Sequence, residues 1–426
     1  MIRLCGGVAM SELVIYGPNK LEGNIDIHGA KNSTLPLMAA SLLCSGPCIL
    51  HNCPILSDVD ISLKILRHLG CKVERDKNDV VIDPKSADNC EIPDNLMREM
   101  RSSIIFLGAV VSRLGCAKLS FPGGCELGPR PIDLHLSALR KMGIEINENH
   151  GCLDCCVPNG LKAANINLSF PSVGATENII ITACLAKGTT VITNAAREPE
   201  IWDLADFLNS CGAKISGAGE STVVIEGVKS ITGCEHNVIP DRIAAATYLT
   251  AAAVTGSTIT VSKVIPEHIA PVISAFEESG CDIKIKGDSI KIISPKRLNR
   301  VKSIRTMPYP GFPTDAQAPV MAMTTLASGT SIFIENIFES RYKHVGELLR
   351  LGANIKVEGR VAVVEGVQRL SGAPVEATDL RGGAALVVAG LAAQGTTEIF
   401  GIKHLDRGYE SIEKNLSLLG AKIKRT

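Results

Sequence analysis

The sequence predicts an α/β protein of two domains, each built from three copies of a repeat of 68 to 73 residues. Three observations predict this fold class. The chain has 426 residues, which is more than one ordinary hydrophobic core organises. A helix–Gly–strand signature recurs six times, and a second Gly, which opens a β-branched strand, precedes each copy.

The first signature is the end of a helix, then Gly, then a short strand, as in L-G-C-K-V and L-G-A-K-I. Gly is expected there because it adopts the left-handed conformation that ends many helices. The segment from Lys214 to Gly227 predicts that two strands joined by a turn follow this Gly. The six copies lie at Gly70, Gly143, Gly212, Gly280, Gly352 and Gly420.

The second signature lies 23 to 28 residues before each of these glycines. A helix is expected to lead into it, as in the run from Asp241 to Gly256. Helices that share an apolar face would pack inward beneath the sheets. The alternative is one large α/β domain with accidental periodicity. The copies begin at Gly46, Gly115, Gly188, Gly256, Gly329 and Gly395.

The charge balance excludes some classes of protein. Lys plus Arg and Asp plus Glu both number 44, so the basic excess of a nucleic-acid-binding protein is missing. An anionic ligand would therefore require a few cations concentrated in one cleft. Uncharged apolar runs are shorter than the roughly 18 to 20 residues that span a membrane. The segment before Met10, which is a candidate start, is too short for a signal peptide, so we expect a cytoplasmic protein.

Fifteen cysteines are scattered along the chain, several of them in apolar stretches, including Cys44, Cys48 and Cys211. A long chain without a secretory signal favours reduced thiols that act as small core residues. The run His150–Cys156 resembles half of a zinc site, but a matching second pair is missing. We interpret that run as a strand. The sequence predicts no metal site and no cofactor, because it contains neither a phosphate-binding lysine loop nor a dinucleotide fingerprint.

Candidate chemistry begins with the Gly- and Pro-rich segment from Phe121 to Leu136, which we expect to be a loop. It contains Cys125, with Arg130, Asp133 and His135 close by. A thiol in an electropositive loop can be activated or can deliver a proton. A Gly-rich connector with an incidental Cys is the alternative.

Three further segments carry polar groups beside turns. In G-A-K-N-S-T-L-P-L, Lys31 and Asn32 lie where a helix begins, which suits an anion; an ordinary helix cap is the alternative. Asp315 follows a Pro-rich turn and is either a general base or the N-cap of the next helix. Arg407 beside Gly408 is suited to a phosphate or carboxylate, or forms a surface ion pair with Asp406.

Taken together, six motifs in register resemble the UDP-N-acetylglucosamine 1-carboxyvinyltransferase family of EPSP synthase-like enzymes. The motifs are G-A-K-N-S-T-L-P, P-G-G-C-E-L-G-P-R-P-I-D-L, S-V-G-A-T-E-N, N-A-A-R-E-P-E-I, F-P-T-D-A-Q-A-P and D-R-G-Y-E. The resemblance covers nearly the whole chain. It implies an inside-out α/β barrel of six βαβαββ-type units, with one domain at 32–239 and the other at 1–31 plus 240–426. It also implies an active site in the cleft between the domains.

The resemblance implies transfer of the enolpyruvyl group of phosphoenolpyruvate to the 3-hydroxyl of UDP-N-acetylglucosamine, with release of phosphate. This is the first committed step of peptidoglycan synthesis, and so of cell-wall biogenesis, cell shape and division. Asp315 would accept the hydroxyl proton or help to deprotonate the intermediate, and Cys125 would act as proton donor and can also form a covalent adduct with phosphoenolpyruvate. The other implied contacts are, for phosphoenolpyruvate, Lys31, Asn32, Arg130 and Arg407, and, for the nucleotide sugar, Arg101, Arg130, Pro131, Ile132, Asp133, Leu134, Ser172, Val173, Gly174, Asp315 and Ile337.

Two departures from the family pattern stand out: Phe170 replaces a frequent Lys, and Ala244–Ala246 follow D-R-I. Because Cys125 is present, the resemblance also implies sensitivity to fosfomycin, a covalent inhibitor at that thiol. The alternatives are 3-phosphoshikimate 1-carboxyvinyltransferase, with the same donor and another acceptor, and a catalytically silent paralogue that binds UDP-sugars. A nucleic-acid-processing relative is disfavoured by the neutral charge and the few aromatic residues.

Overall fold

The computed structural model describes residues 12–123 and 132–426. Contacts divide the chain into two compact units. The N-terminal unit comprises His28–Asp241 and Pro308–Pro310, and the C-terminal unit comprises the segment ending at Ile27, Arg242–Met307 and Gly311–Thr426. Each unit has its own hydrophobic core.

The unit boundaries differ by a few residues from those expected at 31/32 and 239/240. Lys31 belongs to the N-terminal unit because the chain on either side of the boundary is paired there. Ala30 N–H donates to Ile239 C=O at 2.7 Å, and Gly29 forms a β-bridge with Pro240. Tyr309 joins the same unit through a 3.3 Å hydrogen bond from its N–H to Glu198.

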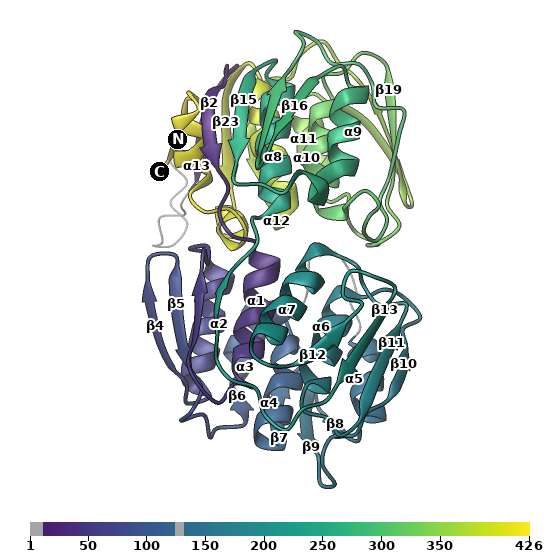
Figure 1. Ribbon diagram of the computed structural model, residues 1–426. Coiled ribbons are helices and arrows are strands. Elements are labelled where there is room, and N and C mark those ends of the chain that lie inside the picture. Colours follow the sequence, from purple (N-terminus) through teal and green to yellow (C-terminus); the bar gives the residue numbers. More distant parts are fainter. Residues whose placement is uncertain (1–11, 124–131) are drawn as a thin grey trace. The chain divides into compact units, whose positions relative to one another are not determined.

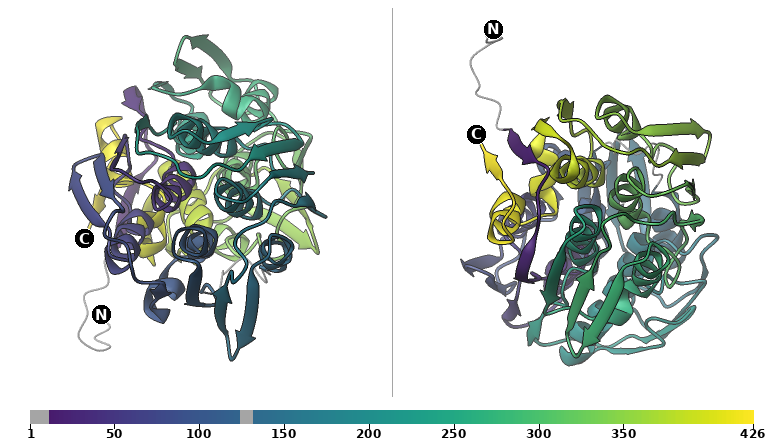
Figure 2. Two further views of the ribbon diagram at one scale, coloured as in Figure 1. Left: turned by 60° about the horizontal axis from the view of Figure 1, so that its bottom comes forward. Right: turned by 90° about the horizontal axis from the view of Figure 1, so that it is seen from above.

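Helices occupy the interior of the N-terminal unit and its strands lie outside them (Figures 1 and 2). Its helices are α1 (Lys31–Ser41), α2 (Ser57–His68), α3 (Asp94–Glu99), η1 (Arg101–Ile105), α4 (Phe106–Leu114), α5 (Asp133–Lys141), α6 (Val173–Ala183) and α7 (Pro199–Ser210). Its strands are β3 (Cys48–His51), β4 (Lys72–Asp76), β5 (Asp79–Asp83), β6 (Glu91–Ile92), β7 (Cys116–Ser120), β8 (Glu145–Asn149), β9 (Cys152–Cys156), β10 (Asn165–Asn167), β11 (Thr189–Thr193), β12 (Lys214–Ser216), β13 (Thr222–Glu226) and β14 (Glu235–Asn237).

The C-terminal unit repeats this plan. Its helices are α8 (Arg242–Val254), η2 (Pro266–Ile269), α9 (Ala270–Glu278), α10 (Thr314–Thr324), α11 (Val345–Arg350), α12 (Leu380–Ala392), η3 (Ile402–Arg407) and α13 (Ile412–Leu418). Its strands are β1 (Leu13–Gly17), β2 (Glu22–Asp26), β15 (Thr258–Ser262), β16 (Asp282–Lys286), β17 (Ser289–Ile293), β18 (Ser303–Arg305), β19 (Thr330–Ile334), β20 (Asn354–Glu358), β21 (Val361–Glu365), β22 (Pro374–Glu376), β23 (Gly395–Phe400) and β24 (Ile423–Arg425).

The described residues form six four-stranded sheets, one for each predicted repeat. In the order β10-β11-β13-β12, the first pair is parallel and the other two pairs are antiparallel. Strands distant in sequence complete three of the sheets: β14 pairs with β3, β2 with β15, and β1 with β23 and β24. The six predicted helix-ending glycines all have φ between 90° and 100°.

The innermost helices are buried on nearly every side, which explains why they lack an amphipathic pattern. In the C-terminal unit, α8, α10 and α12 pack against one another. Ala244–Ala246, the departure noted in the sequence, lie in α8 and are at most 1% exposed, so their small side chains allow close helix packing. Phe170, the other departure, is 41% exposed.

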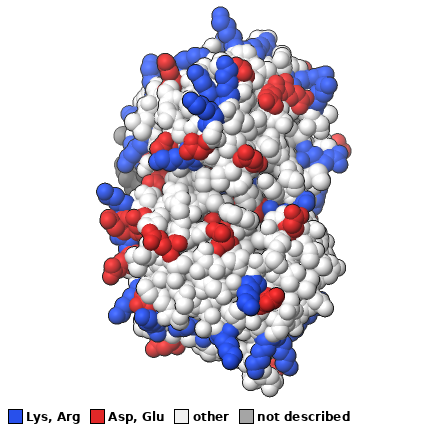
Figure 3. Space-filling view, in the orientation of Figure 1, with Lys and Arg blue, Asp and Glu red and all other residues white. Residues whose placement is uncertain are grey.

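The charged side chains and the thiols are distributed as follows in the described residues. On the face drawn in Figure 3, basic and acidic side chains are interspersed. Every cysteine in the described part of the chain is a free thiol, and Cys152–Cys156 form the predicted strand, β9. Among the described residues, no helix is both long and apolar enough to cross a membrane.

Candidate active site

Asp315 is the second residue of α10, and its carboxylate is held by two arginines. Arg341 donates to Oδ1 at 2.8 Å and Arg381 donates to Oδ2 at 3.0 Å. Both arginine side chains are buried, whereas Asp315 is 28% exposed. The N-cap of α10 is Pro313, so the interpretation of Asp315 as the cap is wrong. A fixed, partly exposed carboxylate has the geometry that a general base requires.

Sequence reasoning missed both arginines. Arg341 also donates to the backbone carbonyl of Thr314 at 2.8 Å, and Arg381 donates to the hydroxyl of Tyr409 at 3.2 Å. They lie 26 and 66 residues from Asp315 in the sequence. A single sequence contains no local pattern that pairs residues at such distances, and only the fold brings them together.

Glu335 connects Ile337 to the start of α10. Its Oε1 accepts hydrogen bonds from the N–H groups of Ile337 at 2.8 Å and Phe338 at 3.0 Å. Its Oε2 accepts from the hydroxyl of Thr314 at 3.0 Å. The loop that carries Ile337 is therefore fixed beside Asp315, so the structure brings together two residues that the sequence assigned to one site.

Arg407 is the last residue of η3, which packs against α12, the helix that carries Arg381. Asp406 accepts from both terminal nitrogens of Arg425, at 3.0 and 2.6 Å, and Arg425 also contacts Glu413 at 3.1 Å. Strand β24 thereby fixes the helical turn that positions Arg407.

In the N-terminal unit, Lys31 is the first residue of α1, and the half-buried Asn32 follows it. The Lys31 ammonium donates to Asp58 of α2 at 3.3 Å, and both side chains are largely buried. Ala30, the N-cap, contributes no side-chain hydrogen bond. The Lys31 N–H also donates to the buried carboxylate of Asp241 at 3.4 Å, so acidic side chains already lie at the positive end of α1, where anions are favoured.

A buried network of side-chain hydrogen bonds fixes the start of α1. The Ser33 hydroxyl donates to Asp203 of α7, and His236 Nε2 lies 2.9 Å from the other oxygen of the same carboxylate. All three side chains are buried. Since Ser33 is two residues from Lys31, this network positions the first turn of α1.

Within the N-terminal unit, several of the residues predicted to hold the nucleotide sugar lie near His135. Burial and the neighbouring positive charge of Arg101 lower the pKa of His135 to about 4. His135 Nδ1 lies 3.1 Å from the amide of Asn178 in α6, and the Cα of Gly174 lies so close that a β-carbon there would be 3.2 Å from the imidazole. Arg101, Asp133, Leu134 and the segment Ser172–Gly174 therefore belong to one neighbourhood, formed by η1, α5 and α6.

The loop expected from Phe121 to Leu136 ends earlier than predicted. Helix α5 begins at Asp133, because Leu136 and Leu139 pack into the core and an acidic first turn favours a helix start. His135 is thus a buried helical residue. Ile132 is the last residue before α5. Three other site predictions, Cys125, Arg130 and Pro131, lie outside the described residues.

Comparisons with known proteins show the fold and the family of this chain. The family model for EPSP synthase (3-phosphoshikimate 1-carboxyvinyltransferase) matches residues 15–416. The solved enolpyruvyl transferase NikO from Streptomyces tendae superposes with a TM-score of 0.89 at 26% identity, covering 98% of this chain and 99% of that one. EPSP synthase from Acinetobacter baumannii, at 17% identity and a TM-score of 0.75, shares the fold and covers 98% of this chain and 100% of its own.

The fold therefore defines the class: an α/β protein of the enolpyruvyl transferase type. Two curated relatives are more similar. UDP-N-acetylglucosamine 1-carboxyvinyltransferase 2 of Caldanaerobacter subterraneus subsp. tengcongensis is 53% identical, covering 98% of this chain and 100% of its own. UDP-N-acetylglucosamine 1-carboxyvinyltransferase 1 of Carboxydothermus hydrogenoformans is 50% identical, covering 98% of each. The chain belongs to the UDP-N-acetylglucosamine 1-carboxyvinyltransferases, within the EPSP synthase family.

Proposed function

We propose that this protein transfers the enolpyruvyl group of phosphoenolpyruvate to the 3-hydroxyl of UDP-N-acetylglucosamine, releasing phosphate, as the first committed step of peptidoglycan synthesis. The observation that carries the proposal is about half identity over 98% of the chain to enzymes named for this reaction. The carboxylate of Asp315, which two arginines hold, is a group that can accept a proton in this reaction.

The addition step requires a proton acceptor for the sugar hydroxyl and a proton donor for C3, and the elimination step requires a base that takes a proton back from C3. The sugar oxygen attacks C2 of phosphoenolpyruvate and loses its proton, while C3 gains a proton. The tetrahedral intermediate then loses a proton from C3 and expels phosphate, which restores the double bond. We assign the acceptor role to Asp315, because Arg341 and Arg381 fix both of its oxygens. We assign the donor role to Cys125 on the family motif.

Phosphoenolpyruvate is strongly anionic, and the chain has no net charge, so local cations must bind it. We assign this role to Lys31, Arg130 and Arg407, with Asn32 beside Lys31. Arginine forms planar paired hydrogen bonds with phosphate or carboxylate, whereas lysine acts as a point charge. For the nucleotide sugar we propose Arg101, Pro131, Ile132, Asp133, Leu134, Ser172, Val173, Gly174 and Ile337, with Arg130 and Asp315 at its reactive end.

We further propose that the protein works in the cytoplasm, where both substrates are made, and supports cell-wall growth, cell shape and division. Its loop thiol, Cys125, would make it a target of fosfomycin. Incubation with fosfomycin should abolish activity and add one inhibitor mass to the peptide that contains Cys125. Full activity after saturating treatment would refute this assignment.

The test of the function is phosphate release from phosphoenolpyruvate with either UDP-N-acetylglucosamine or shikimate 3-phosphate as acceptor. We expect release only with the nucleotide sugar, and a loss of about 100-fold or more in Asp315→Asn. Cys125→Ala should also lose turnover. Release with shikimate 3-phosphate would identify that molecule, and not the nucleotide sugar, as the acceptor. A folded protein that binds the nucleotide sugar but releases no phosphate would be the silent paralogue.

A further inference from the structure

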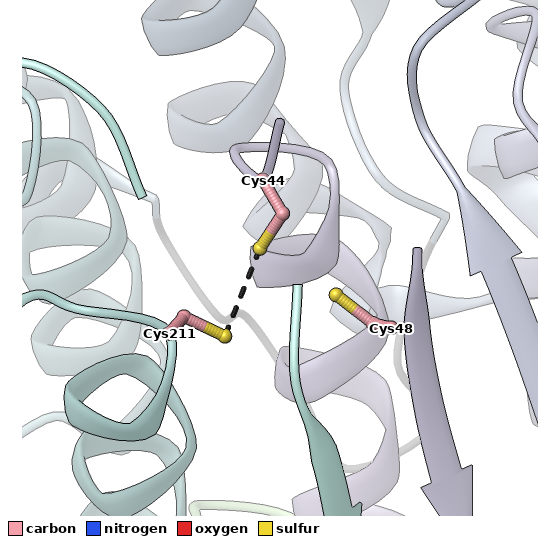
Figure 4. A group of neighbouring side chains, drawn as sticks. All are labelled: Cys44, Cys48 and Cys211. Atoms are coloured by element: carbon pink, nitrogen blue, oxygen red, sulfur yellow. Dashed lines mark hydrogen bonds between the residues drawn. The ribbon is translucent and has the colours of Figure 1, made fainter. Parts of the chain in front are cut away.

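Three buried cysteine sulfurs of the N-terminal unit lie close together (Figure 4). The Sγ atoms of Cys44, Cys48 and Cys211 all lie within 4.8 Å of one another, and those of Cys44 and Cys211 are 3.8 Å apart. Cys44 follows α1, Cys48 opens β3 and Cys211 caps α7. Three separate segments therefore direct their thiols to one point.

A fourth thiol lies at the edge of this group. Cys234 is partly buried, and its Sγ lies 3.2 Å from that of Cys211. Its carbonyl accepts a 2.9 Å hydrogen bond from Ile49 N–H, so the backbone of Cys234 is anchored beside Cys48. We call Cys44, Cys48, Cys211 and Cys234 the thiol cluster.

Other buried thiols in the same unit donate hydrogen bonds to backbone carbonyls. Cys184 donates to the carbonyl of Ile180 at 3.3 Å, and Cys53 donates to that of Leu50 at 3.6 Å. A buried lone thiol is usually a small apolar residue with a weak S–H donor. In the thiol cluster the sulfurs meet one another, which is the arrangement of ligands around a soft metal ion.

We propose that the thiol cluster binds one zinc-type divalent cation through four thiolates. Zn²⁺ in Cys₄ sites is tetrahedral with Zn–S near 2.3 Å, so its ligand sulfurs lie about 3.8 Å apart. The Cys44–Cys211 separation equals this value, the Cys48 sulfur lies within 4.8 Å of both, and the Cys234 sulfur lies 3.2 Å from that of Cys211. Thiolate ligands select soft ions over Mg²⁺ or Ca²⁺, which take oxygen ligands.

The thiol cluster is separate from the proposed catalytic residues. Lys31 begins α1 and Cys44 follows its other end; a helix of 11 residues is about 16 Å long. A cation here would connect α1, β3, α7 and the segment before β14, which closes the first sheet of the unit. We therefore assign it a structural role that does not depend on the proposed function.

The test is zinc binding by the full chain, purified in reductant, incubated with Zn²⁺ and desalted. We expect about one retained zinc per chain, and Co²⁺ in its place should give the intense visible bands of a tetrahedral cobalt thiolate. Cys48→Ser should lose both signals, whereas Cys184→Ser, the matched buried lone thiol, should keep them. The cobalt spectrum of the unaltered chain decides the question even if Cys48→Ser fails to fold.

Three outcomes would overturn the proposal. Retention of zinc by folded Cys48→Ser would place the metal elsewhere. If zinc and the cobalt bands were both absent, and the four thiols were titratable after unfolding, these cysteines would be reduced core residues that bind no metal. A Cys211–Cys234 disulfide that persists in the presence of Zn²⁺ would show a redox pair instead.

Discussion

His135 shows how burial changes the role that a residue's chemistry suggests. It lies in the motif that contains the candidate catalytic thiol, and an exposed histidine there would be a natural proton donor. Burial and the charge of Arg101 lower its pKa to about 4, against the opposing effect of Asp133. At neutral pH the imidazole is therefore uncharged, and we infer that it positions η1 and α6 through Asn178.

This shift predicts loss of stability in acid. An unfolded histidine has a pKa near 6.5, so between about 6.5 and 4 the unfolded chain binds the proton that the folded chain excludes. Stability is complete above pH 6.5 and falls as pH drops towards 4. From pH 7 to pH 5 the free energy of unfolding should decrease by about 2 kcal/mol through His135.

Urea denaturation of the unaltered chain and of His135→Gln at both pH values measures this contribution. The variant should lose about 2 kcal/mol less than the unaltered chain over the same interval. Equal losses would mean that His135 is not the source. His344, buried in the C-terminal unit, has its pKa lowered to about 4 by burial, so His344→Gln tests the same argument in the other unit.

Candidate site residues could be proposed from the sequence where a motif is local, and not where the partners are distant. Asp315, Lys31 and Arg407 stand in short recognisable segments. Arg341 and Arg381 do not, because each meets Asp315 only through the packing of separate elements. The interpretation of Asp315 as an N-cap failed for the same reason: without the arginines, a carboxylate after a Pro-rich turn favours a cap.

At the scale of elements, glycines of the fifth repeat separate two kinds of constraint. Gly352 ends α11 with a φ of 91° and open space where a β-carbon would lie. Gly366 follows β21, and a β-carbon there would lie 1.6 Å from the carbonyl oxygen of Ala327. Gly352→Ala should cost about 1 kcal/mol from backbone strain alone, whereas Gly366→Ala should cost more than about 3 kcal/mol.

Urea denaturation of the two single variants provides the comparison, with each serving as the control for the other. Gly227, which follows β13 in the third repeat, has the same constraint against Ala186, so Gly227→Ala should behave like Gly366→Ala. If Gly366→Ala were no more destabilising than Gly352→Ala, Gly366 would not lie as close to the Ala327 carbonyl as the structure places it.

A second prediction at this scale concerns the link between β24 and η3. Removing the guanidinium in Arg425→Met releases Asp406 and Glu413, and the turn that carries Arg407 loses its anchor. We expect KM for phosphoenolpyruvate to rise roughly fivefold, corresponding to about 1 kcal/mol, with little change in kcat. Steady-state kinetics measure this.

Lys424→Met, on the same strand, is the matched control because the Lys424 ammonium lies over the ring of Tyr16 and does not support η3. Its KM should stay within about twofold of that of the unaltered chain. A similar rise in both variants would indicate a general loss of charge.

The periodicity made the helix ends and the strand pairs predictable, because Gly in the left-handed conformation is a strong local signal. It did not define where α5 begins. Asp133 and Leu134 follow a segment rich in Gly and Pro, which predicts a continued loop, whereas burial of Leu136 against the core favours a helix.

At the scale of the whole chain, the two units were predictable from the repeats, but the contacts between distant segments were not. Cys44 and Cys211 are 167 residues apart, and the sequence suggested only scattered core thiols. Their meeting depends on two helices of different repeats ending at the same place. Sequence periodicity defines each repeat, whereas the packing of one repeat on another depends on side-chain shape, which periodicity does not encode.

Strand β1 lies between β23 and β24 in the last sheet of the C-terminal unit, and Leu13 and Ile15 are fully buried. A chain that begins at Met10 keeps β1 and should match the full chain within about 0.5 kcal/mol. A chain that begins at Pro18 loses both ladders and three buried or nearly buried apolar side chains, worth more than about 5 kcal/mol.

Such a loss is comparable with the whole stability of a typical domain, so the C-terminal unit of the chain that begins at Pro18 should be unfolded in the absence of urea. The N-terminal unit, whose sheets do not include β1, should keep its own transition in urea denaturation followed by circular dichroism. A strand from the opposite end of the chain completes this sheet. Folding of the C-terminal unit would then depend on pairs such as Leu13 and Ile399, which are nearly 400 positions apart in the sequence. A single transition unchanged from that of the full chain would show that β1 adds little to this unit.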